Sequence, residues 1–214
     1  MAMDNVFEID HPLVQHHLAV LRDKSTSSAE FRRLVRRLST LLAYEATKDL
    51  ELKPQTVETP LATTTCRRLG ERIGLVPILR AGLGMVDPVL DLIPEAEVWH
   101  LGFYRDEKTL QPVEYYKKLP HGGAVEVAMI LDPMLATGGS AVAAIKAVLK
   151  WGVRNVKLLS MIAAPEGVKV VQNTYPDTQI YMCVIDEKLN DRGFIVPGLG
   201  DAGDRTFNAP ARNE

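Results

Sequence analysis

Short apolar runs alternate with amphipathic stretches through most of the chain. The apolar runs have the length of buried β-strands and lie at residues 73–79, 98–104, 127–131, 156–163 and 180–185. Apolar residues at helical spacing predict helices at residues 11–22, 27 to the 43–49 region, 85–92, 141–151 and 166–174. Repeated strand and helix units joined by short loops predict an α/β fold, with a Rossmann-like parallel sheet that helices cover on both faces.

The most informative unit is residues 125–150, where an apolar strand, a glycine-containing loop and a helix follow one another directly. A loop that enters a helix N-terminus has unpaired N–H groups and faces the positive end of the helix dipole, so it can bind an anion without a basic side chain. Gly138 and Gly139 allow a close approach of the backbone, and Thr137 and Ser140 add hydroxyl donors. These residue types suit a phosphate group.

The same residue types also occur in ordinary helix caps and turns, and the loop by itself leaves both interpretations open. Asp132 favours ligand binding, because it follows the strand directly at the edge where parallel sheets bind their ligands. The loop lacks the Gly-Lys-Ser/Thr sequence of a nucleoside-triphosphate P-loop and the G-x-G-x-x-G sequence of a dinucleotide-binding fold. Neither of those two classes of protein is therefore indicated.

Three more charged residues lie at strand ends or among glycines. Arg80 ends a predicted strand and is followed by two glycines, which indicates either a second anion-binding loop or a turn with a surface arginine. Arg105 also ends a predicted strand. Asp201 lies in the glycine-rich residues 198–203, where the backbone either makes close contacts or forms a flexible turn.

Three segments lack a clear period. Residues 53–68 are rich in residues that favour strands, and we interpret them as extended. Residues 105–118 alternate between apolar and charged side chains, which is typical of an exposed hairpin or arm. Residues 190–208 are rich in glycine and proline but include apolar anchors, and such a long irregular segment is usually functional or disordered. We favour a functional segment.

Composition narrows the class of protein. The chain has 214 residues, 46% of them hydrophobic, and a net charge of −2, which suits one domain over residues 1–214. The basic run at residues 32–37 fits the solvated side of a helix, so we expect no nucleic-acid partner. Cys66 and Cys183 are the only thiols, and no run is long enough to span a membrane. We therefore expect a cytoplasmic protein without a membrane partner.

Four separated motifs carry a resemblance to a known family. They are PILRAGLGM at 77–85, FYRDE at 103–107, LDPMLATGGS at 131–140 and PGLGDAGDR at 197–205. Together, in this order, they resemble the uracil phosphoribosyltransferases, which are type I phosphoribosyltransferases that make UMP and pyrophosphate from uracil and 5-phosphoribosyl-1-diphosphate. The resemblance extends from about residue 11 to residue 207.

The resemblance implies a role for each motif. It implies the catalytic residues Arg80, Arg105 and Asp201 and a Mg²⁺ ion held mainly by substrate and water, with Asp201 as a further contact. The residues implied to bind phosphoribosyl diphosphate are Arg80, Arg105, Asp132, Pro133, Met134, Leu135, Ala136, Thr137, Gly138, Gly139, Ser140 and Asp201. Those implied to bind uracil are Ile195, Gly200, Asp201 and Ala202. Residues 105–118 would form a flexible arm, and residues 190–208 a uracil-binding hood.

The resemblance also implies a homodimer or a higher homo-oligomer, and leaves open whether GTP is an effector. Related purine enzymes carry an acidic residue where this chain has Ala136, so the group that removes the uracil proton stays open. Phe194 stands where the family usually has tyrosine, and Asn208 where it usually has glycine. These two departures leave the hydrogen bonding of the hood open.

Two other functions stay open at this point. One is a pyrimidine-responsive, RNA-binding attenuation regulator on the same fold, which would need a basic face and no uracil-binding hood. The other is a phosphoribosyltransferase that acts on another base.

Overall fold

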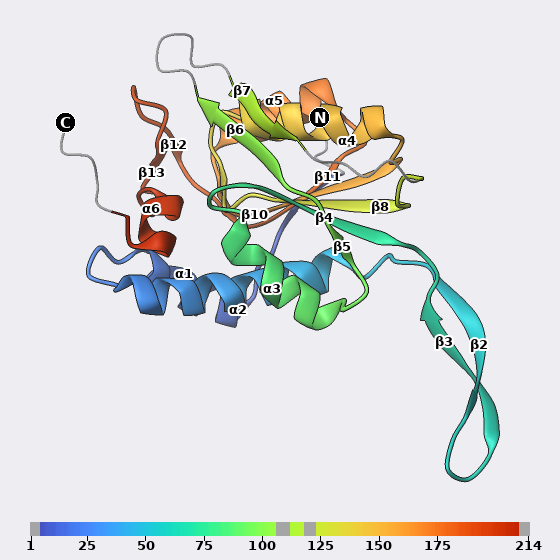
Figure 1. The fold of residues 1–214 in the computed structure, drawn as a ribbon. Helices are drawn as coiled ribbons and strands as arrows, with labels where there is room; N and C mark the ends of the chain where they lie inside the picture. The colour runs from blue at the N-terminus through green and yellow to red at the C-terminus, as the bar shows by residue number, and fades with distance from the viewer. Residues whose placement is uncertain (1–4, 106–111, 118–122, 210–214) are drawn as a thin grey trace.

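The computed structural model describes residues 5–105, 112–117 and 123–209, and within them the central element is a sheet of nine strands (Figure 1). The strands are β1 (Val6–Glu8), β4 (Ile73–Leu79), β5 (Glu97–Val98), β6 (Leu101–Arg105), β7 (Pro112–Lys117), β8 (Val127–Leu131), β9 (Met134–Leu135), β10 (Asn155–Ala163) and β11 (Gln179–Ile185). They follow the order β1-β11-β10-β8-β4-β6-β7, while β5 pairs with β4 and β9 with β10. Among these pairs, β6 and β7 are antiparallel and the others are parallel.

Helices cover both faces of this sheet. They are α1 (Pro12–Arg22), α2 (Ser28–Ala46), α3 (Leu83–Leu92), α4 (Gly139–Trp151), α5 (Pro165–Thr174) and, apart from the sheet, α6 (Ala202–Phe207). Figure 1 shows α1, α2 and α3 below the sheet and α4 and α5 above it. The α/β fold class with helices on both faces is confirmed.

Strand β8 explains why the central apolar run is continuous. Val127, Met129 and Leu131 belong to the core on the side of α1 to α3, whereas Ala128 and Ile130 belong to the core on the side of α4 and α5. All five side chains are fully buried. Because successive side chains of a strand point to opposite faces, a strand with a core on each side needs apolar residues at every position.

Capping residues determine two of the predicted helix boundaries, the start of α2 and the end of α4. Ser27 is the N-cap of α2, and its hydroxyl accepts a hydrogen bond from the Glu30 N–H at 3.3 Å. Gly152 ends α4 with a φ of 112°, a left-handed conformation that glycine adopts without a steric cost. Both predicted boundaries are confirmed.

Two predictions need correction. The run at residues 98–104 is two short strands, β5 and β6, interrupted at Trp99, whose ring packs against Gly74 and stands edge-on to Trp151. The sheet also contains one antiparallel pair, β6 with β7, in the region where the sequence indicates a hairpin or arm. The segment at 190–208 is not wholly irregular, since it contains α6 and β13 (Ile195–Val196), which pairs with β12 (Lys188–Leu189). Strand β1 is an addition, too short at three residues to give a pattern.

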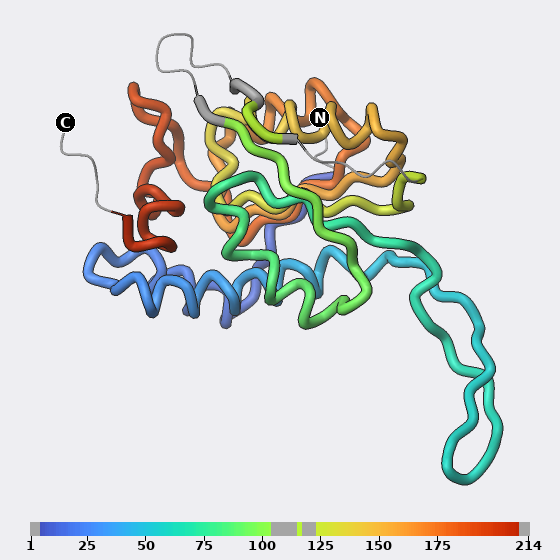
Figure 2. The backbone as a smooth tube through the Cα atoms, viewed as in Figure 1, coloured from blue at the N-terminus to red at the C-terminus, as the bar shows by residue number. Residues whose placement is uncertain are grey.

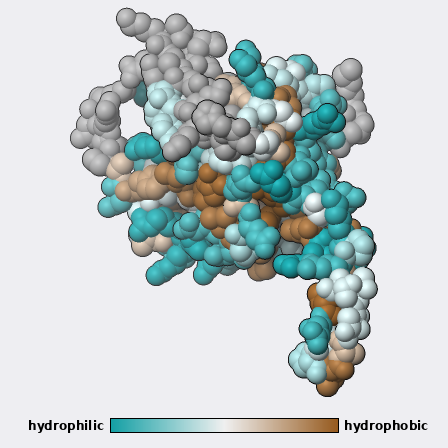
Figure 3. Space-filling model, turned by 45° about the vertical axis from the view of Figure 1, so that its right-hand side comes forward, coloured by the Kyte–Doolittle hydropathy of each residue, from teal (hydrophilic) through white to brown (hydrophobic). Residues whose placement is uncertain are grey.

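Residues 53–68 are extended, as predicted, but they form a hairpin that leaves the body of the molecule (Figures 1 and 2). Its strands are β2 (Leu52–Glu58) and β3 (Thr63–Leu69), paired with Leu52 opposite Leu69. Almost every residue of the hairpin is exposed, and Leu61 at its tip is 97% exposed. Figure 3 shows hydrophobic residues near this tip.

The parallel strands place their carboxyl ends along one edge of the sheet. The arm formed by β6 and β7 and the hood segment with α6 both lie at the left of Figure 1, at this edge. The loops after β4 and β8 also begin here, so the predicted ligand-binding segments share one region. No helix of the described residues is both long and apolar enough to cross a membrane.

Candidate active site

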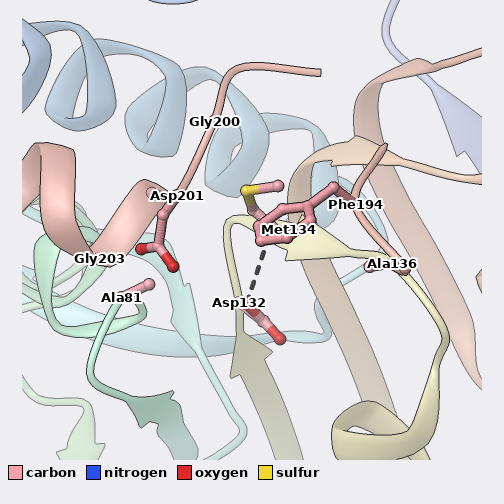
Figure 4. Close-up of a pocket in the computed structure, with 10 residues that line it drawn as sticks. Ala81, Asp132, Met134, Ala136, Phe194, Gly200, Asp201 and Gly203 are labelled. Carbon is pink, nitrogen blue, oxygen red and sulfur yellow. Dashed lines mark hydrogen bonds between the residues drawn. The ribbon is translucent and has the colours of Figure 1, made fainter. Parts of the chain in front are cut away.

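A cavity of about 210 Å³ lies where the loops after β4 and β8 meet the hood (Figure 4). The loop after β4 contributes Ala81, and the loop after β8 contributes Asp132, Met134 and Ala136. The hood contributes the rest of the lining, namely Gly193, Phe194, Gly200, Asp201, Ala202 and Gly203. Figure 4 shows the Phe194 ring beside the Met134 side chain and the Asp201 carboxylate directed toward Ala81.

Two glycines let the loops approach this closely. A Cβ on Gly82 would lie 2.3 Å from the Leu131 carbonyl oxygen, so the loop after β4 packs directly on the end of β8. A Cβ on Gly167 would lie 2.3 Å from the Ala136 carbonyl oxygen, so α5 packs just as closely on the loop after β8. Any side chain at either position would push these loops apart.

The loop after β8 is held in place by the neighbouring strand. The Pro133 carbonyl accepts a hydrogen bond from the Met161 N–H at 3.0 Å, and the Leu135 carbonyl accepts one from the Ala164 N–H at 2.9 Å. Gly138 then starts α4 as its N-cap, with a φ of 82° and no side-chain capping bond. A helix start without such a cap keeps its first-turn N–H groups available for an anion. The geometry therefore agrees with the phosphate-binding loop that the sequence predicts.

The fold raises the pKa of Asp132, a titratable group of the cavity lining. Burial of its carboxyl raises the pKa from the ordinary value of 3.8 to about 7, although a hydrogen bond from the Met134 N–H, at 3.2 Å, acts in the opposite direction. A carboxylate buried without a cation is in an unfavourable environment. It gains stability from a ligand that brings hydroxyl groups or positive charge.

The hood and the loop after β4 are joined by charged side chains. Asp201 is the N-cap of α6, where its carboxylate accepts a hydrogen bond from the Asp204 N–H at 2.8 Å. The Asp204 carboxylate in turn pairs with the Arg80 guanidinium at 3.0 Å. Asp204 therefore holds the predicted anion-binding arginine against the hood.

The structure brings seven of the fifteen predicted site residues to the cavity or next to it. Asp132, Met134, Ala136, Gly200, Asp201 and Ala202 line the cavity, and Arg80 lies next to it through its neighbour Ala81. The predicted residues of the loop that do not line the cavity are Pro133, Leu135, Thr137, Gly138, Gly139 and Ser140. Ile195 does not line it either, because its side chain is 4% exposed and packs in the core. Of the predicted arm at residues 105–118, the side chain of Arg105 and residues 106–111 and 118 lie outside the described residues.

Five residues of this region were not among the predicted site residues. They are Ala81, Gly193, Phe194, Gly203 and Asp204. Gly203 and Asp204 belong to the PGLGDAGDR motif, so the motif pointed to the right segment. The sequence did not indicate that Asp204 pairs with Arg80, because the two residues lie 124 positions apart.

A model of the uracil phosphoribosyltransferase family matches residues 8–209 of this chain. The chain belongs to this family. A relative from Roseiflexus sp. (strain RS-1), itself named uracil phosphoribosyltransferase, is 58% identical over 205 residues, which cover 96% of this chain and 99% of the relative. A relative of the same name from Brevibacillus brevis is 56% identical over 206 residues, with the same coverage.

Two solved structures share the fold of this chain. A protein from Aquifex aeolicus has a TM-score of 0.92 to this chain at 40% identity, and the match covers 96% of this chain and 99% of the other. A hypoxanthine-guanine phosphoribosyltransferase from Bacillus anthracis has a TM-score of 0.51 at 12% identity, covering 74% and 80%. This second likeness shows the fold alone and confirms the type I phosphoribosyltransferase fold.

The side chains of this chain's site do not by themselves form a complete set of metal ligands. In the parts of the chain that the structure describes, no three His, Cys, Asp or Glu side chains are arranged to hold a metal ion. The carboxylates that line the cavity are those of Asp132 and Asp201. A divalent cation at this site would need further oxygen ligands from a bound molecule or from water.

Proposed function

We propose that this protein transfers the 5-phosphoribosyl group of phosphoribosyl diphosphate to uracil and releases pyrophosphate. One observation supports this most: Asp132 and Ala136, from the loop that leads into the uncapped start of α4, line the same cavity as the glycine-rich backbone of the hood. The first set of groups suits a sugar phosphate and the second suits a planar base. The names of the close relatives agree with this activity.

The chemistry replaces one bond at C1 of the ribose by another. The bond from C1 to the pyrophosphate oxygen breaks, a bond from C1 to N1 of uracil forms, and N1 gives up its proton. Positive charge develops on the ribose and negative charge on the leaving pyrophosphate. Arg80 and Arg105 stabilise the leaving group, while Asp132 accepts hydrogen bonds from the ribose hydroxyls. The first-turn N–H groups of α4 hold the 5-phosphate.

Mg²⁺ fits this site as a partner of the substrate. The carboxylates of Asp132 and Asp201 face the cavity, and phosphoribosyl diphosphate supplies the additional oxygen ligands that the protein lacks. When bound, the ion neutralises charge on the pyrophosphate. Asp201 keeps its capping bond to α6 through one oxygen, so its second oxygen is the one that can meet the ion.

Uracil recognition rests on backbone groups of the hood. Gly200 has a φ of 79° and lies in the cavity lining, where its peptide groups can approach a planar ring closely. Uracil offers ring N–H groups and carbonyls that such groups match. Cytosine reverses donor and acceptor at two positions and would leave buried groups unpaired. Ala136 has no acidic group, so another group at the site, pyrophosphate or water takes the uracil proton.

Oligomerisation is the second part of the proposal. The hairpin of β2 and β3 is a two-stranded element with little contact to the body, and such elements are only marginally stable in water unless another surface covers them. We therefore expect a second copy of the chain to pack on it, around Leu61. Sedimentation of the parent protein and of Leu61→Lys tests this, and a parent monomer would contradict it.

One assay tests the activity. Uracil and phosphoribosyl diphosphate should give UMP and pyrophosphate in the presence of Mg²⁺, and the rate should collapse when the ion is chelated. A panel of free bases tests the base, and rates with and without GTP test whether GTP is an effector. The RNA-binding regulator is not supported by the relatives, and it would be revived only by RNA binding at moderate salt without UMP formation.

A further inference from the structure

The hood is tied to the body of the molecule through Gly198. The Arg22 guanidinium, at the end of α1, donates one hydrogen bond to the Gly198 carbonyl at 2.7 Å and pairs in a bidentate manner with Asp186 at 2.8 and 2.5 Å. The Asp186 carboxylate also accepts a hydrogen bond from the Gly198 N–H at 3.0 Å. Both backbone polar groups of Gly198 are therefore held by one ion pair.

This ion pair is well shielded from water. The side chain of Asp186 is 4% exposed and that of Arg22 is 23% exposed. Charged hydrogen bonds in such an environment are shorter and stronger than those at a surface, and the planar guanidinium fixes direction as well as distance. The position of the Gly198 peptide is thus determined by two side chains that the cavity lining does not include.

Gly198 has a conformation that the rest of the hood depends on. Its φ is 65°, and a Cβ there would lie 2.1 Å from the Ile195 carbonyl oxygen, so the segment folds back tightly on itself. The next carbonyl, that of Leu199, is also held, because it accepts a hydrogen bond from Arg205 at 2.8 Å. Arg205 is fixed in turn by the Asp23 carbonyl at 2.6 Å, next to Arg22 in the sequence.

The hydrogen bonds that tie the hood to the body of the molecule end at Leu199, one residue before the cavity lining. The polar groups of Gly198 and the Leu199 carbonyl are occupied by the body of the molecule, and Gly200 is the first residue of this run that lines the cavity. A displacement of Gly198 would also displace Gly200, because only two peptide bonds separate the two residues. Hydrogen bonds to a planar base tolerate such errors poorly.

We propose that Arg22 and Asp186 are positioning residues for base recognition, which hold the hood backbone at the place where it reads the pyrimidine. This proposal rests on the proposed function above. It assigns them no contact with uracil or with phosphoribosyl diphosphate. Their loss should therefore weaken uracil recognition more than the binding of phosphoribosyl diphosphate, for which the proposed function uses the loop after β8 as well as Asp201 of the hood.

Asp186→Asn is the variant that tests this, because it keeps the size of the side chain. One oxygen of the Asp186 carboxylate accepts from both the Gly198 N–H and Arg22 Nη1, and the other accepts from Arg22 Nη2. An amide has a single acceptor oxygen, so its NH₂ group faces a donor at the second position and the bidentate pair is lost. We expect the KM for uracil to rise by roughly 10- to 100-fold, since a displacement of about 1 Å has effects of that size. The KM for phosphoribosyl diphosphate should rise less than the KM for uracil, and the preference for uracil over cytosine should fall.

Asp49→Asn is the matched control. Asp49 pairs with the buried Lys157 near the start of β10, at the opposite edge of the sheet from the cavity. This variant is also an aspartate-to-asparagine change that weakens an ion pair between distant segments, so it reports the effect of lost stability alone. It should lower the melting temperature without changing either KM.

Arg22→Lys is the conservative variant. Lysine keeps the charge but loses the fork that reaches Asp186 and Gly198 together, so its KM for uracil should lie between those of the parent and Asp186→Asn. A uracil KM and base preference that match the parent in Asp186→Asn, or that change equally in Asp49→Asn, would overturn the positioning role. A parent protein that forms no UMP would instead overturn the proposed function, and this inference with it.

Discussion

Replacing Asp132 by asparagine should stabilise the free protein at neutral and alkaline pH while removing its activity. Burial raises the pKa of this carboxyl from 3.8 to about 7 in the folded protein. Between these two values the unfolded chain has lost the proton and the folded protein still holds it, so the free energy of unfolding falls as the pH rises. At 1.36 kcal/mol per pH unit, the full difference is about 4 kcal/mol above pH 7.

Asparagine does not titrate, so the variant avoids this loss. From pH 5 to pH 8.5, the free energy of unfolding of Asp132→Asn relative to the parent should rise by about 3 kcal/mol, because about two of the three pH units lie in that range. Urea unfolding at several pH values, without substrate or Mg²⁺, measures this difference. Asp201→Asn is the control, since it removes an exposed carboxylate of the same cavity and should not stabilise the protein in this way.

Parallel stability curves for the parent and Asp132→Asn over this range would refute the reasoning, because the carboxyl would then be hydrated or paired in the folded protein. A substrate effect gives a second check. Phosphoribosyl diphosphate with Mg²⁺ brings hydroxyl groups and positive charge to Asp132, so it should flatten the pH dependence of the parent and have little effect on the variant.

Three further variants test other parts of the site. Arg105→Ala should lower kcat/KM, because the loss of one donor to the leaving group costs ~2–4 kcal/mol of transition-state stabilisation. An unchanged kcat/KM would show that Arg105 has no role in the mechanism. Gly138→Val places a side chain on a residue with a φ of 82°, where a Cβ would lie 2.9 Å from the Gly167 carbonyl oxygen, so it should abolish sugar-phosphate binding. A normal affinity measured by calorimetry would contradict the assignment of this loop to the phosphate. Asp201→Asn keeps a good N-cap for α6 but loses the charge, so it should weaken the Mg²⁺ dependence and retain the preference for uracil over cytosine. A lost preference with unchanged Mg²⁺ dependence would mean that Asp201 reads the base.

Sequence patterns predicted the structure best where the local conformation of a segment and its burial in the fold call for the same residue types. In the unit at residues 125–150, the strand is apolar at each position because both faces are buried, and Gly138 of the loop has a conformation that few other residues adopt. These properties depend on near neighbours, so the pattern alone predicts strand, loop and helix. The fold class followed from repetition of such units.

Features that depend on distant partners could not be predicted in this way. The ion pair of Arg80 with Asp204 and the bonds of Arg22 to Gly198 join residues 124 and 176 positions apart. Phe194 enters the cavity because β13 pairs with β12, which is two residues long and has no measurable period. The hairpin of β2 and β3 lacked a pattern because neither of its faces meets a core within one chain.

The long separation between Arg22 and Gly198 also bears on how the molecule is assembled during synthesis. A ribosome adds 5–20 residues per second, so the hood glycine follows the end of the phosphate loop by roughly 3 to 12 s. In that interval the chain adds β10 and α5, which hold the phosphate loop, while the Arg22 guanidinium still lacks its partner Gly198. A chain interrupted before Gly198 would leave the cavity without Gly200 to Gly203 of its lining, because this part of the hood is made last.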